Sequence, residues 1–105
     1  MKNFLNYKEK TTRIFFTEHA LEEMNAEEEV ITPEEVREVI FNGEVIEDYP
    51  EDRRGHSYLI SLRTSQKRHI HVVCAPKESY LTIITVYAPT SNKWKGDFKI
   101  RREQK

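Results

Sequence analysis

This sequence of 105 residues has few cysteines, glycines and prolines, and it lacks any long hydrophobic run. Its single cysteine, Cys74, excludes an intrachain disulfide framework and is typical of a reducing compartment. No apolar stretch approaches the roughly 20 residues that a membrane-spanning helix needs, and the first residues lack the apolar core of a secretory signal. These absences predict one cytoplasmic domain over residues 1–105 with no membrane partner.

Basic residues are scarce in one long part of the chain and acidic residues in another, so the charge is unevenly distributed even though the net charge is only −1. Residues 1–13 carry a net charge of +3, residues 14–52 carry −13, and residues 53–105 carry +9. Such asymmetry favours an anionic partner at the basic end. The alternative is a solvated acidic helical region that a basic sheet neutralises, with no partner involved.

Two helices are expected in the acidic region. Thr17 is placed to cap a helix that runs to about Met24. The second helix has stronger signals, because residues 32–35 (Thr-Pro-Glu-Glu) combine a cap, a proline at the first helical position and a capping-box glutamate. Asn42-Gly43 ends this helix.

After Gly43 the hydrophobic pattern changes to the alternation of strands. Strands are expected over residues 45–49, 58–62, 69–75 and 80–87, with a short strand or extended lead-in at residues 13–16. Short connections between consecutive strands require antiparallel pairing. The predicted fold is α+β, with two helices packed on one face of a curled four-stranded antiparallel sheet, and a basic C-terminal tail over about residues 90–105.

The register of the last two strands is left open by the sequence. Pairing Pro76 with Tyr80 across a three-residue turn sets His71 opposite Thr85, so that polar residues of both strands share one face. Pairing Pro76 with Ser79 instead places these polar residues on opposite faces.

Histidines are the first candidates for chemistry. His19 would lie in the first turn of a helix, where the helix dipole keeps the imidazole neutral, as a general base must be; alternatively it only helps to cap that helix. His69 and His71 share a strand face, but Cys74 points to the other face, so a zinc site there lacks its ligands. We therefore expect no metal and no cofactor.

Cleavage of RNA without a metal needs a base, a cation for the developing phosphorane charge and an acid for the leaving oxygen. His71 or His19 can serve as the base, Arg68 as the cation and Tyr87 as the acid, while Thr85 can position the phosphate. The alternative is that Thr85 and Tyr87 are ordinary strand-forming residues.

The basic tail is a candidate surface for nucleic acid, because an aromatic ring among cations can stack a base while the charges hold phosphates. Trp94 is that aromatic residue, although it can equally anchor the tail to the core. The candidate phosphate-binding residues are Lys93, Lys95, Lys99, Arg101 and Arg102.

Several short motifs follow one another in an order that resembles a known family. They are His19-Ala20 with Met24, Asn42-Gly43-Glu44-Val45-Ile46, Arg68-His69-Ile70-His71, and Thr85-Val86-Tyr87-Ala88-Pro89 with Trp94 beyond. The series resembles a widespread group of small bacterial domains of unknown function, which is similar to the RelE-like, metal-independent ribonuclease toxins.

The resemblance implies a toxin-like endoribonuclease of a toxin–antitoxin system. RNA is then the expected substrate, and a cognate antitoxin, often of the zinc-ribbon type, is the expected protein partner. The oligomeric state is left open. The site residues that the resemblance implies are His19, Arg68, His71, Thr85 and Tyr87.

The sequence also departs from the family pattern. Members tend to have arginine four residues after the helix histidine, where this chain has Glu23, and an Arg-Gly pair before the second helix, where it has residues 25–29 (Asn-Ala-Glu-Glu-Glu). These changes predict a divergent or non-catalytic member. The alternative function is a non-catalytic module on the same fold that binds nucleic acid or an acidic protein.

Overall fold

Two helices begin at the predicted caps in this computed structural model, which describes residues 13–103. Helix α2 spans Glu18–Ala26 and helix α3 spans Pro33–Asn42. The side-chain oxygen of Thr17 accepts a hydrogen bond from the Ala20 amide at 3.0 Å, and that of Thr32 accepts one from the Glu35 amide at 3.2 Å. Both caps satisfy amide groups that the first helical turn leaves unpaired. No helix within residues 13–103 is long and apolar enough to cross a bilayer.

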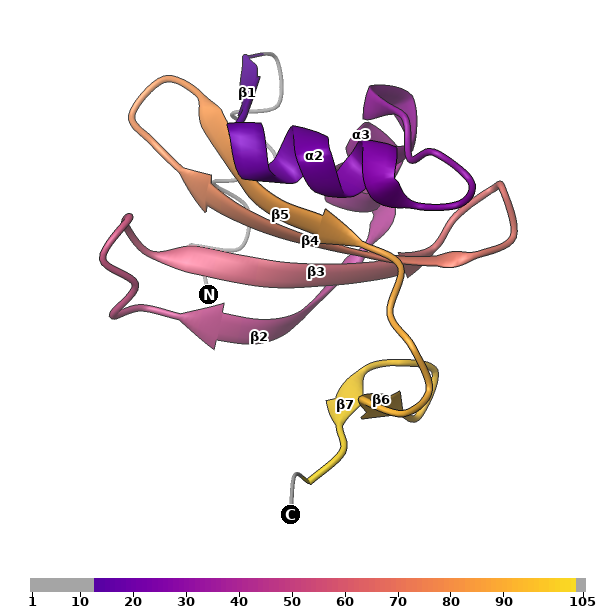
Figure 1. Ribbon diagram of the computed structural model, residues 1–105. Helices are drawn as coiled ribbons and strands as arrows, with labels where there is room; N and C mark the ends of the chain where they lie inside the picture. The colour runs from indigo at the N-terminus through magenta and orange to yellow at the C-terminus, as the bar shows by residue number, and fades with distance from the viewer. Residues whose placement is uncertain (1–12, 104–105) are drawn as a thin grey trace.

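Five strands form one mixed sheet. They are β1 (Ile14–Phe16), β2 (Glu44–Tyr49), β3 (Ser57–Arg63), β4 (His69–Pro76) and β5 (Leu81–Tyr87), in the order β1-β5-β4-β3-β2 (Figure 1). The α+β class is as predicted, but the four-stranded antiparallel sheet is wrong in one respect. The lead-in at residues 13–16 joins the sheet as a fifth strand, parallel to β5, because the Leu81 amide donates to the Arg13 carbonyl and the Thr17 amide to the Ile83 carbonyl.

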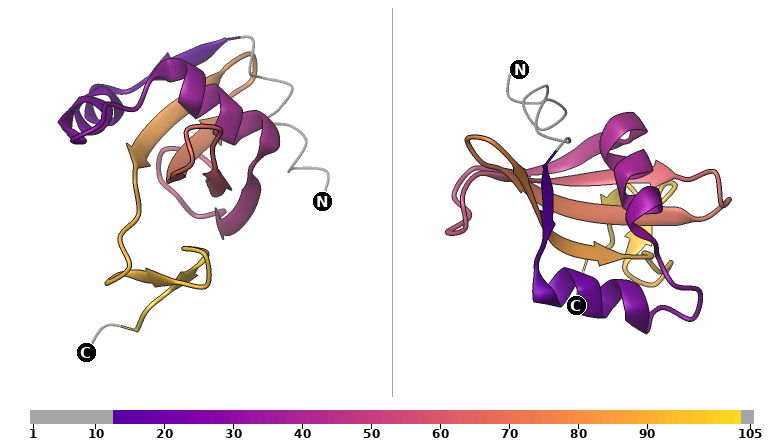
Figure 2. Two further views of the ribbon diagram at one scale, coloured as in Figure 1. Left: turned by 90° about the vertical axis from the view of Figure 1, so that its right-hand side faces the viewer. Right: turned by 90° about the horizontal axis from the view of Figure 1, so that it is seen from above.

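The main core lies between the helices and one face of the sheet (Figures 1 and 2). Alternation sends Ile60, Val72 and Val86 of β3, β4 and β5 toward the helices, where all three are fully buried. Residues at the alternate positions therefore point to the opposite face, which we call the second face. The candidate catalytic residues of β4 and β5 lie on this second face.

Neither register considered for β4 and β5 is correct. Pro76 pairs with Leu81 across a four-residue turn, and a bulge in β5 then shifts the pairing by one residue. Beyond the bulge His71 pairs with Tyr87 and Val73 with Thr85. The longer turn and the bulge each shift the pairing by one residue in the same direction. A total shift of two residues restores the face, so His71, Thr85 and Tyr87 still share the second face.

The basic tail begins with a small hairpin of β6 (Trp94–Lys95) and β7 (Ile100–Arg101). The hairpin lies on the second face, opposite the helices (Figure 1). Trp94 is only 3% exposed and anchors it there. Its turn has three successive residues with positive φ, Gly96, Asp97 and Phe98, which turns the Phe98 carbonyl toward the sheet.

Candidate functional site

A buried hydrogen-bonded chain occupies the second face of the sheet. Nε2 of His71 is 2.7 Å from the Phe98 carbonyl oxygen, and its Nδ1 is 3.2 Å from the Tyr87 hydroxyl. Because a carbonyl oxygen can only accept, Nε2 carries the proton and Nδ1 accepts the Tyr87 proton. Trp94 packs edge-on against the same ring at 4.5 Å. His71 is thus fully buried, and burial lowers its pKa to about 4, so the ring is neutral at neutral pH.

Tyr87 connects this buried chain to a cavity of about 360 Å³, which we call the Tyr87 cavity. Burial raises the pKa of Tyr87 to about 12, so the phenol stays protonated. With its proton donated to His71, the phenol oxygen has only acceptor lone pairs left to offer. The lining residues are Glu23, Tyr87, Ala88, Pro89, Thr90, Lys93, Trp94 and Arg101.

Arg68 does not reach the second face. Its guanidinium forms two hydrogen bonds with the buried Glu35 carboxylate, at 2.7 and 3.0 Å, and two more with the carbonyls of Glu29 and Val30. Arg68 immediately precedes β4, so it points to the side opposite His69, toward the helices. The buried Glu35 carboxylate needs a cationic partner, and Arg68 is that partner. The structure therefore places Arg68 away from His71.

His19 lies on the outer side of α2 and makes no contact with His71. Its side chain is 64% exposed, and its Nε2 is 3.3 Å from the Glu23 carboxylate. Glu23 in turn accepts a hydrogen bond from the Val86 amide at 2.9 Å, and Glu27 accepts one from the Ala88 amide at 3.2 Å. Since β1 pairs only with the first half of β5, these two carboxylates satisfy the amides along the remaining edge.

Thr85 shares the second face with Tyr87 but faces Val73 rather than His71. Within residues 13–103, no side-chain hydrogen bond joins Thr85 to His71 or to His19. Of the five implied catalytic residues, the structure therefore joins His71 with Tyr87, places Thr85 on the same face, and separates His19 and Arg68 from them.

The hairpin cations divide into two groups. Lys99 pairs with Glu44 at 2.8 Å, and Arg101 pairs with Glu47 at 2.8 Å while lying 4.6 Å above the Trp94 ring. Three other cations are exposed and have no acidic partner within residues 13–103, and we call them the outer cations. They are Lys93, Lys95 and Arg102.

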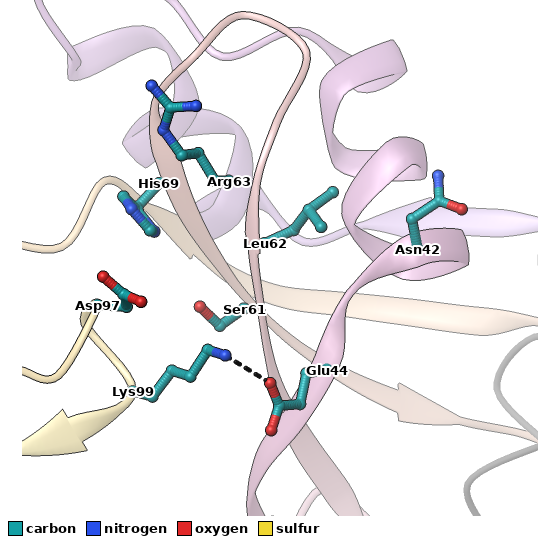
Figure 3. Close-up of a pocket in the computed structure, with 8 residues that line it drawn as sticks. All are labelled: Asn42, Glu44, Ser61, Leu62, Arg63, His69, Asp97 and Lys99. Atoms are coloured by element: carbon teal, nitrogen blue, oxygen red, sulfur yellow. Dashed lines mark ion pairs between the residues drawn. The ribbon is translucent and has the colours of Figure 1, made fainter.

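A second cavity of about 300 Å³ lies between the sheet and the hairpin turn (Figure 3). Figure 3 shows His69 and Asp97 at one side and the Lys99–Glu44 ion pair at the other. Its charges are mixed, so it favours no ligand of one sign. No three His, Cys, Asp or Glu side chains in the described part of the chain lie close enough to hold a metal ion, and the zinc alternative at His69 and His71 gains no support.

Sequence reasoning missed the acidic residues that border the site. Glu23 is four residues from His19 on one helix, a spacing at which side chains meet, so this pair has a sequence signal. Glu47 and Arg101 are 54 residues apart, and no local signal joins them.

One family model matches the chain over residues 16–88, more than half of its length, and its description is Domain of unknown function (DUF4258). No curated protein and no solved structure matches the chain.

Proposed function

The chain belongs to the DUF4258 family of domains of unknown function, and we propose that it is a non-catalytic module that binds single-stranded RNA. The bound strand would contact the Tyr87 cavity and the outer cations of the hairpin. The observation that carries this proposal is the position of Lys93, which lines the cavity and is also one of the three outer cations that have no acidic partner within residues 13–103.

Backbone geometry groups the outer cations. The Arg102 amide donates to the Lys93 carbonyl at 2.9 Å, which sets these two residues opposite each other across the hairpin. Trp94 and Arg101 pair on the face that packs on the sheet, so alternation turns Lys95 away from it, while the exposed Lys93 and Arg102 flank the two strands. Cations without acidic partners can release counterions from a phosphate backbone, which supplies most of the affinity in sequence-independent binding.

Binding is favoured over catalysis because the expected catalytic groups are engaged elsewhere. A general base must come within hydrogen-bonding reach of the proton that it removes. His71 is fully buried, and both of its ring nitrogens already have partners. The charge of Arg68 is matched by Glu35, so it is not free to stabilise a phosphorane.

RNA cleavage at the same cavity is a second candidate, and the hydrogen-bonded chain from Phe98 through His71 to Tyr87 favours it. In this case His19 would take the 2′-hydroxyl proton as that oxygen attacks phosphorus. The Tyr87 hydroxyl would have to turn away from Nδ1 of His71 to give its proton to the leaving 5′-oxygen as the bond from phosphorus to that oxygen breaks. The likeness to RelE-like toxins supports this candidate, and a zinc-ribbon antitoxin would then be the expected inhibitor.

The test measures binding of a labelled single-stranded RNA of about 12 nucleotides, within the site sizes of single-strand binders, at several salt concentrations. We expect log affinity to fall linearly with log salt. The variant K93Q/K95Q/R102Q should lose about 2 from that slope, because each contact with a single strand contributes about 0.7. The control R37Q/R53Q/K67Q makes the same charge change at exposed positions elsewhere and should leave the slope unchanged.

Absence of binding even at low salt would remove RNA as the ligand. Equal binding of polyglutamate, lost in the same variant, would instead identify an acidic protein partner. Gel analysis of the incubated RNA separates the two candidates, because cleavage by the wild type and not by Tyr87→Phe would establish the enzyme.

A further inference from the structure

We infer that the Tyr87 cavity selects guanine, with the Glu23 carboxylate accepting the two adjacent N–H donors of the base. The inference rests on the proposed RNA binding and adds a base preference to it.

Glu23 is held in a fixed orientation with acceptor capacity to spare. One carboxylate oxygen accepts from the Val86 amide at 2.9 Å, and the other is 3.3 Å from Nε2 of His19. Each carboxylate oxygen has two lone pairs, so each retains one. The side chain is 27% exposed and lines the cavity. A ligand therefore meets a preorganised pair of acceptors.

The Tyr87 oxygen adds a third acceptor to this wall, because its proton is committed to His71. Lys93, which has no acidic partner within residues 13–103, lines the same cavity, as does Arg101, which is paired with Glu47. A volume of about 360 Å³ is at the small end of the range for ligand-binding cavities, about 300–1,000 Å³. The cavity thus matches a small ring with adjacent N–H donors that is attached to a phosphate.

Guanine is the base whose pairing edge presents two adjacent donors, the N1–H and the N2 amino group. Adenine and cytosine present one amino group beside a ring-nitrogen acceptor, and uracil presents one N–H between two carbonyls. Each of these three would place an acceptor against a carboxylate oxygen, and such repulsion is an effective source of specificity.

The experiment compares uridine oligonucleotides that carry one central guanosine, inosine or adenosine. Inosine lacks only the N2 amino group. We expect the guanosine oligonucleotide to bind about tenfold more tightly than the inosine or the adenosine one, in the range of a well-formed paired contact to a base. Glu23→Gln should abolish the preference, measured within the variant itself as the ratio of its affinities for the guanosine and the inosine oligonucleotides.

Glu27→Gln is the matched control. Glu27 caps the Ala88 amide as Glu23 caps the Val86 amide, but it does not line the cavity, so its variant should keep the preference. The glutamine oxygen can still accept from the backbone amide in both variants. Should Glu23→Gln fail to fold, the comparison of guanosine with inosine on the wild type tests the same contact from the RNA side.

The outcomes are distinguishable. If no oligonucleotide binds, the proposed function fails. If all bind equally, RNA binding stands and the guanine inference is overturned. If Glu23→Gln keeps the guanine preference, Glu23 is not the residue that reads the base, and the inference is also wrong.

Discussion

Nδ1 of His71 lies 3.2 Å from the phenol oxygen of Tyr87, and the two rings meet edge to face across the paired strands β4 and β5. This contact fixes the direction of two hydrogen bonds at once. The Phe98 carbonyl accepts from the far side of the imidazole, so the ring adopts one tautomer and the phenol proton points inward.

The first prediction concerns the pH dependence of stability. The pKa of His71 is about 4 in the folded chain and about 6.5 when unfolded, so the unfolded chain binds more protons between these values. The free energy of unfolding should therefore fall by about 3 kcal/mol in total as the pH drops through 6.5 and then through 4, and the contribution of His71 should level off about one pH unit below its folded pKa. Urea unfolding across this range measures the effect, and His71→Gln should lack this part of the dependence. A His71 NMR resonance that titrates near 6.5 would contradict the assignment.

The second prediction concerns the buried ion pair between Arg68 and Glu35. Arg68→Met leaves a carboxylate that is 3% exposed without its cation, so it should cost about 3 kcal/mol or more of stability. The double variant E35M/R68M removes both charges and should cost less than Arg68→Met alone. Equal costs would show that the pair itself is unimportant. Denaturant midpoints of the wild type and the two variants measure this.

Lowering the pH should narrow the difference in the free energy of unfolding between the wild type and Arg68→Met. Burial raises the pKa of Glu35, but hydrogen bonds from Arg68 and Thr64, together with the guanidinium charge, bring it below its ordinary value of 4.5. The wild type therefore loses this stabilisation as the pH falls through that depressed pKa. In Arg68→Met the effect of burial on the pKa of Glu35 dominates, so the carboxylate takes up its proton at higher pH. The destabilisation that comes from a buried, unpaired charge then disappears.

The third prediction concerns the cap of α3. Thr32→Ala removes the acceptor of the Glu35 amide and should cost about 1 kcal/mol. Thr90→Ala is the control, since Thr90 is exposed and lies outside the helices. A denaturation midpoint that moves equally in both variants would mean that the cap contributes nothing.

Features that depend on neighbouring residues could be predicted from the sequence, and features that join distant residues could not. The caps at Thr17 and Thr32 follow from side chains three residues from their donors. The partner of Arg68 is 33 residues away, and only the folded structure shows that this partner is Glu35. Alternation places His71 on one face of β4, and Thr85 and Tyr87 on one face of β5. Whether these faces coincide, and the direct pairing of His71 with Tyr87, depend on the turn length and on a bulge that has no sequence signal here.

The position of Glu23 shows the same limit. The sequence shows that it lies four residues after His19 on one helix, but its role as the acceptor for the Val86 amide depends on where β1 stops pairing with β5. An arginine at position 23 could not replace Glu23 in this role, because its guanidinium is a hydrogen-bond donor, as is the Val86 amide.

The parallel pairing of β1 with β5 has a consequence for how fast the chain folds. The hydrogen bond from the Thr17 hydroxyl to the Ile84 carbonyl joins residues 67 positions apart, whereas β3, β4 and β5 are joined by short turns. Closing the long loop loses conformational entropy before any contact repays it, and topologies rich in such pairs fold slowly. We expect the meander to form first and β1 to dock last, so that weakening the β1–β5 contact speeds unfolding more than it slows refolding.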